Sequence, residues 1–167
     1  MIVYILSWFV SILFILVKGG IENHTILKSI DVDIVIVLIV YLLMLYGETG
    51  VGIFAFCQGL VIDIFSGGML GFFAFVYLVV FFCITLGSRS MDISSTGGQM
   101  AIIFIAVLLK NILMVTFLYL FSMEIVFSFY DLLFFAFSAI CSSLIAPILF
   151  YLLNLLNRIY IGADGEI

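Results

Sequence analysis

Long runs of apolar residues, separated by short polar or glycine-containing stretches, dominate this chain. The runs are continuously apolar, whereas the strands of a membrane barrel alternate between apolar and polar residues, so the pattern predicts helices. A helix needs about 20 mainly apolar residues to cross a bilayer. The fold class predicted is an all-α integral membrane protein, a compact bundle of six transmembrane helices. The six segments cover residues 2–17, 34–46, 50–65, 70–86, 100–121 and 132–156.

The second segment, residues 34–46, is the shortest of the six. Its 13 residues reach only about 20 Å as a helix, and Asp31, Asp33 and Glu48 flank it. It either crosses as a short span that thins the bilayer locally or lies at the membrane interface, which would leave five spans. Since no polar stretch is long enough for a separate soluble domain, residues 1–167 are expected to form a single multi-pass membrane domain.

The composition is that of a chain solvated by lipid. Hydrophobic residues make up 67% of the chain and charged residues 9%, whereas about a quarter of a soluble domain is charged. The net charge of −5 is carried by few residues, and lysines and arginines form no cluster. Nucleic-acid binding and a polybasic lipid-binding patch are therefore not expected.

Residues with catalytic or metal-binding chemistry are sparse. The cysteines Cys57, Cys83 and Cys141 lie inside apolar runs with no Cys-x-x-Cys spacing, so neither a disulfide framework nor a metal site is expected. His24, the only histidine, lies in a polar loop, which leaves no serine–histidine or histidine–metal site within the membrane. We expect no cofactor, no metal and no enzymatic activity.

The orientation is predicted from the few basic residues. Residues 2–17 lack a basic leading region and a small-x-small cleavage site, so we expect a retained first span and not a signal peptide. With six spans, Lys18 and Lys28 lie on one side of the membrane, while Arg89, Arg158 and the terminal amine lie on the other. This count favours neither side clearly. We expect both termini to be cytoplasmic.

Two ionisable residues, Asp63 and Lys110, lie deep in apolar segments, where a charge is costly and normally faces protein or water. Their depths along their helices are similar, about 20 Å and about 15 Å. A buried Asp63–Lys110 ion pair is therefore the main structural hypothesis. Two alternatives are that Asp63 caps the turn at Ser66 at the lipid–water boundary, and that Lys110 extends to the membrane surface. Asn111 is expected to hydrogen-bond to another helix.

A face of small residues accompanies Asp63. On a helix, Gly52, Phe56, Gly59 and Asp63 fall within about 60° of one another. The glycines give this face a shallow groove that another helix can approach closely, either a helix of a partner or one of the same chain. The predicted partner-binding or structural motif comprises Gly52, Gly59, Asp63, Ser66, Gly67 and Gly71.

The stretch GLVIDIFSGGMLG, residues 59–71, resembles the signature hairpin of the bacterial rod shape-determining protein MreD family. That family has a glycine-rich third span leading into Gly-Leu-x-x-Asp-x-x-Ser-Gly, and then a Leu-Gly that opens the next span. The rest of the chain matches the family only in length and hydropathy. The residues here at the family's positions are Gly59, Leu60, Asp63, Ser66, Gly67, Leu70 and Gly71.

The resemblance implies a non-catalytic scaffold subunit of the cell-elongation complex in the bacterial inner membrane, which supports cell shape and lateral peptidoglycan synthesis. The implied partners are MreC and, through it, the actin-like MreB and the wall-elongation glycosyltransferase and transpeptidase. In this interpretation, the face of Gly52, Gly59 and Asp63, or its neighbouring hairpin, docks a membrane helix of a partner.

Two other functions stay open. MreD resembles the six-helix substrate-binding subunits of energy-coupling-factor vitamin transporters, so the chain could instead be such a subunit and bind a small molecule. A third interpretation is ion or proton passage through Asp63 and Lys110. Two isolated ionisable groups form a poor relay, and the scaffold is therefore favoured.

Overall fold

The computed structural model of the chain describes residues 2–21, 33–66, 70–93, 95–121 and 129–163. Within these ranges all regular secondary structure is helical. The helices of the described part are α1 (Ile2–Ile21), α2 (Ile34–Tyr46), α3 (Glu48–Ser66), α4 (Phe72–Ser90), α5 (Thr96–Phe121) and α6 (Phe129–Ala163).

Four of these helices, α3, α4, α5 and α6, are long and apolar enough to cross a membrane. The protein is therefore an all-α membrane protein, as the apolar runs predict. Each predicted segment overlaps one helix, although α4 begins at residue 72 and not 70, α5 begins earlier than residue 100, and α6 continues past residue 156. Membrane crossing by α1 and by the shorter α2 stays a prediction, as does a complete six-span bundle.

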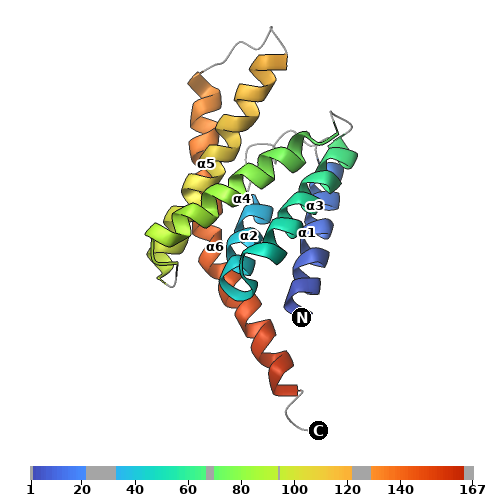
Figure 1. The fold of residues 1–167 in the computed structure, drawn as a ribbon, viewed down its shortest axis with the longest axis vertical. Coiled ribbons are helices and arrows are strands. Elements are labelled where there is room, and N and C mark those ends of the chain that lie inside the picture. Colours follow the sequence, from blue (N-terminus) through green and yellow to red (C-terminus); the bar gives the residue numbers. More distant parts are fainter. Residues whose placement is uncertain (1, 22–32, 67–69, 94, 122–128, 164–167) are drawn as a thin grey trace.

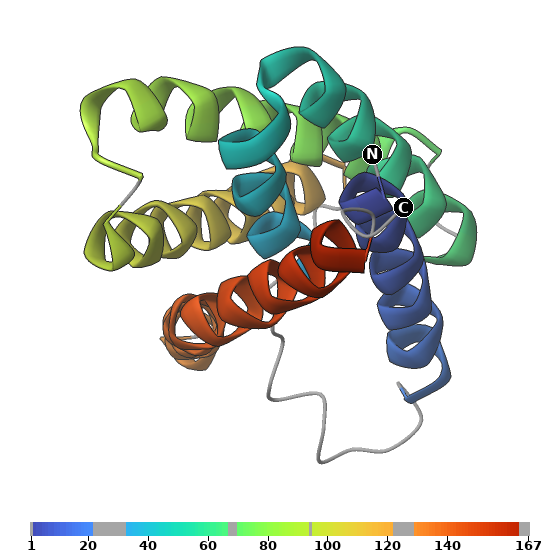
Figure 2. The ribbon, with the colours of Figure 1, turned by 90° about the horizontal axis from the view of Figure 1, so that it is seen from below.

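Two antiparallel helix pairs, α3–α4 and α5–α6, form most of the molecule (Figure 1). Contacts between α4 and α5 join the two pairs, and α1 packs along α3. Seen from below, α2 lies between the α3–α4 pair and α6 (Figure 2). The α5–α6 pair extends beyond the other helices at the top of the view in Figure 1.

The short helix α2 forms the centre of the hydrophobic core. All of its residues from Val35 to Leu42 are buried, because each of the other five helices contacts it. A helix that is apolar on every side is typical of such an enclosed position. We conclude that α2 lies among the other helices and not along the outside of the protein.

The two helices of the α3–α4 pair are in close contact at Gly59. A Cβ atom at this position would lie 2.6 Å from the backbone nitrogen of Ala74 and 2.7 Å from the carbonyl oxygen of Phe73. Backbone atoms cannot move aside as a flexible side chain can, so only glycine allows this approach. Gly59 is therefore covered by α4 of the same chain. A partner helix therefore cannot pack against Gly59, and at this residue the alternative of packing within one protein holds. Docking of a partner by the neighbouring hairpin stays a prediction.

Replacing Gly59 with alanine should destabilise the protein by about 1–3 kcal/mol, the usual cost of overpacking, because the new methyl group would push α4 away from α3. Thermal unfolding of the purified protein in detergent, followed by circular dichroism, should show a lower midpoint. Gly50→Ala is the matched control on the same helix, since nothing lies within 4 Å of a Cβ atom there. An equal loss in both variants would contradict the close-contact explanation.

Candidate functional site

Asp63 lies near the end of α3, with 1% of its surface exposed. Its carboxylate accepts hydrogen bonds from the backbone N–H groups of Gly71, Phe73 and Ala74, over distances of 2.9, 2.8 and 3.2 Å. N–H groups at the start of a helix have no partner in their own helix, and the helix N-terminus attracts negative charge. A side chain of α3 therefore caps α4.

The local backbone makes this cap available. Gly71, directly before α4, has a φ of 94°, in the left-handed region that favours glycine. It carries no side chain that could cap α4 itself, so the N–H groups are left for Asp63. The Ser66 hydroxyl donates a hydrogen bond to the carbonyl oxygen of Asp63 at 3.2 Å. Gly67, the remaining residue of the predicted motif, lies outside the described residues.

Lys110 pairs with Asp33 and not with Asp63. The Lys110 Nζ atom lies 2.7 Å from Asp33 Oδ2, and the two side chains are 6% and 4% exposed. The Tyr77 hydroxyl lies 3.2 Å from each oxygen of the same carboxylate. Asp33 also caps α2 through the N–H of Ile36, and its own N–H donates to the Ser142 hydroxyl. One carboxylate thus connects α2, α4 and α5, and its backbone reaches α6.

The predicted Asp63–Lys110 pair is wrong because depth alone does not make two helices neighbours. α5 packs on α2, α4 and α6, while α3 packs on α1, α2 and α4. The ends of α2 and α5 lie together, since Gln99 of α5 contacts Met44 of α2. From that end, Asp33 and Lys110 are each about 20 Å along their helices at 1.5 Å per residue. Asp33 therefore lies at the same depth as Lys110, and it caps a helix that contacts α5.

The sequence held a signal for Asp33. A hydrocarbon core is about 30 Å thick, so a helix of about 20 Å can place both of its flanks in water only where the bilayer thins around it. In a bilayer of ordinary thickness, with Glu48 at one boundary, Asp33 would lie inside the membrane, where a counter-ion is required. The prediction from the apolar runs places Asp33 only as a flank of residues 34–46. Lys110 does not extend to the membrane surface, since it is buried.

Two amide side chains, Asn111 and Gln58, are also buried. Asn111 is buried, and its Nδ2 atom has no hydrogen-bond partner within the described part of the chain. The bond expected from Asn111 to another helix thus stays a prediction. Gln58, which sequence reasoning missed, accepts a hydrogen bond from the Ser11 hydroxyl of α1 at 2.9 Å. Gln58 interrupts an apolar run next to Gly59, and this position is the signal that could have identified it.

These groups act chemically as connections between helices. Asp33 and Lys110 neutralise each other, and Asp63 is held by backbone N–H groups. Among the residues that the structure describes, no group of three or more histidine, cysteine, aspartate or glutamate side chains could hold a metal ion. The geometry therefore supports a structural role for the buried charges.

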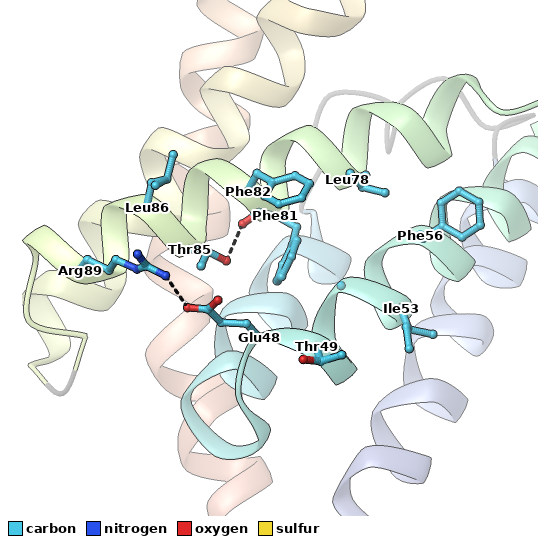
Figure 3. Close-up of a pocket in the computed structure, with 11 residues that line it drawn as sticks. Glu48, Thr49, Ile53, Phe56, Leu78, Phe81, Phe82, Thr85, Leu86 and Arg89 are labelled. Carbon is cyan, nitrogen blue, oxygen red and sulfur yellow. Dashed lines mark hydrogen bonds and ion pairs between the residues drawn. The ribbon is translucent and has the colours of Figure 1, made fainter.

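A groove of about 600 Å³ lies on the outside of the α3–α4 pair (Figure 3). Gly52 contributes to its wall, and a Cβ atom there would lie 3.1 Å from the Phe81 ring. Gly52 thus also faces α4 of the same chain, as Gly59 does. At one end of the groove, Arg89 Nη2 and Glu48 Oε1 form an ion pair of 3.1 Å, with side chains 68% and 56% exposed.

Comparisons with protein-family models, with curated proteins and with solved structures gave no match.

Lys110→Met should destabilise the protein by about 3–5 kcal/mol, because breaking a buried ion pair leaves an unpaired charge. Asp33→Asn combined with Lys110→Met should recover much of this loss, since neither side chain of the pair is then charged. Unfolding midpoints in detergent provide the measurement. Arg89→Gln is the control, because an exposed ion pair contributes only about 0–1 kcal/mol. A double variant no more stable than Lys110→Met would contradict the pairing.

Asp63→Asn should destabilise the α3–α4 pair. The amide nitrogen would replace a carboxylate oxygen that accepts hydrogen bonds from backbone N–H groups at the start of α4, and it cannot accept them. The expected loss is about 1–3 kcal/mol, the usual penalty for buried donors left without a partner. Ser66→Ala is the control, since its hydroxyl bonds only one carbonyl oxygen. Hydrogen exchange at the start of α4 is the measurement, and unchanged protection of the Phe73 and Ala74 amides in Asp63→Asn would exclude the cap.

Proposed function

We propose that this chain is a non-catalytic membrane scaffold subunit of the MreD type, which supports cell shape and lateral peptidoglycan synthesis in the bacterial inner membrane. In this role it contacts MreC and, through it, MreB and the wall-elongation glycosyltransferase and transpeptidase. Both termini are cytoplasmic in this proposal.

The observation that carries this proposal is that the residues of the stretch 59–71 hold α3 and α4 together as a hairpin. Asp63 caps α4, Gly59 lets α4 contact α3, and Gly71 forms the left-handed turn between them. These residues fix the shape of a hairpin and present no reactive group to a substrate. Such use of a motif supports a scaffold more than an enzyme.

The partner surface in this proposal lies on the α5–α6 pair, because Gly59 and Asp63 are already covered by α4. The far end of this pair extends past the other helices (Figure 1). Exposed apolar side chains cover both of its helices there, which suits contact with membrane helices of other proteins. They are Tyr119, Leu120, Phe121, Leu132, Leu133 and Phe134.

A tagged copy purified from its native membrane in mild detergent should recover MreC and the wall-elongation enzymes, identified by mass spectrometry. Tyr119→Ala should lower this recovery several-fold, because it removes a large apolar side chain from the partner surface. Tyr151→Ala is the matched control, since Tyr151 is similarly exposed, 71% against 68%, and lies in the second half of α6, away from the partner surface. Recovery of none of these proteins would refute the proposal.

The transporter subunit is kept as a second candidate because Asp33, Tyr77, Lys110 and Ser142 bring polar groups from four helices together. Their present geometry favours the scaffold, since Asp33 and Lys110 bond each other and a ligand would have to separate them. The same purification distinguishes the two functions. Recovery of a transporter's ATPase pair and coupling membrane subunit would show that the chain is instead the substrate-binding subunit of a vitamin transporter.

A further inference from the structure

The groove between the outer faces of α3 and α4 is apolar along its length and charged at one end. Ile53 and Phe56 line it from α3, and Phe82 and Leu86 line it from α4. All four are exposed, and their side chains are seen in Figure 3 along the two helices. In a membrane protein, such a surface faces hydrocarbon.

The groove begins at the membrane boundary. Both α3 and α4 have the length and composition of membrane spans, Glu48 opens α3, and Arg89 lies in the last turn of α4. The charged end therefore lies at headgroup level. Phe56 lies eight residues further along α3, about 12 Å into the hydrocarbon at 1.5 Å per residue. This depth matches the upper part of a lipid acyl chain.

The two charges at this end are of opposite sign and adjacent. Arg89 and Glu48 bond each other (Figure 3), but both side chains are more than half exposed, and such a pair contributes little free energy. A ligand that offers both a negative and a positive group can replace each partner at little cost. An acidic lipid would pair with Arg89 and be repelled by Glu48.

We propose that the groove binds one phospholipid with a zwitterionic headgroup that carries a primary amine, as in phosphatidylethanolamine. The phosphate pairs with Arg89, the ammonium group donates to Glu48, and an acyl chain lies along Ile53 and Phe56. A phosphocholine headgroup has the same charges but no N–H donor, so it binds Glu48 less strongly. This inference goes beyond the proposed scaffold function and does not rest on it.

The headgroup preference is tested on the purified full chain. The protein in mild detergent is given equal amounts of phosphatidylethanolamine, phosphatidylcholine and phosphatidylglycerol with identical acyl chains, and bound lipid is measured by native mass spectrometry. The ethanolamine lipid should exceed each of the others roughly tenfold, the ratio that about 1.4 kcal/mol produces. Equal binding of the three lipids would overturn the proposal.

Variants of the ion pair test which groups carry this preference. Glu48→Gln should bring the ratio of ethanolamine to choline lipid close to one, whereas Glu48→Asp should keep the preference because the charge remains. Arg89→Gln should weaken binding of all three lipids, since each has a phosphate. An unchanged preference in Glu48→Gln would contradict the assignment of the ammonium group to that carboxylate.

The location of the lipid is tested by filling the groove. Ile53→Trp should abolish the bound lipid, because the larger ring occupies the place of the acyl chain. Ile105→Trp is the matched control on α5, since the two isoleucines are 58% and 56% exposed, and it should leave binding unchanged. Retained binding in Ile53→Trp would overturn the proposal. So would a photoreactive residue at position 53 that captures a protein helix and no lipid in native membranes.

Discussion

A carboxylate buried among membrane helices must meet an opposite charge or a set of hydrogen-bond donors, and the arrangement of this protein depends on that constraint. Two buried aspartates satisfy it differently. Asp33 uses the Lys110 ammonium group and the Tyr77 hydroxyl, and so connects α2 with α5 and α4. Asp63 uses the free N–H groups at the start of α4, and so fixes the α3–α4 turn. Between them they connect four of the helices in the described part of the chain.

The sequence predicted the elements well and the partners of the buried charges poorly. Apolar runs placed all six helices, because solvation by lipid leaves few alternatives for a run of that length. The same reasoning singled out Asp63 and Lys110, both of which are buried. It then paired them by depth, although two residues at equal depth can lie on helices that never touch. Which helices contact one another depends on packing, and the pattern of apolar residues along one helix does not determine these contacts.

The glycines of α3 show the same limit. Helical periodicity places Gly52 and Gly59 seven residues apart on one face, and both do face α4. At Gly59 the backbone of α4 fills the space, whereas at Gly52 only the ring of Phe81 comes near and a groove remains beside it. Helical periodicity predicts that the two glycines leave one face of α3 without large side chains. It does not say whether a backbone, a side chain or a ligand will cover it.

The two ends of the α3–α4 pair use similar groups for different purposes. At one end the Asp63 carboxylate meets its donors out of contact with solvent, so its hydrogen bonds have no competitor and can hold the turn. At the other end Glu48 meets Arg89 in an exposed pair, where other ions compete and the interaction is weak. Because it is buried, the Asp63 carboxylate stabilises the hairpin. Because it is exposed, the Glu48 carboxylate can exchange its partner. Because Asp63 fixes the turn, α3 and α4 continue side by side away from it, and this arrangement brings Glu48 and Arg89 together at the other end of the hairpin.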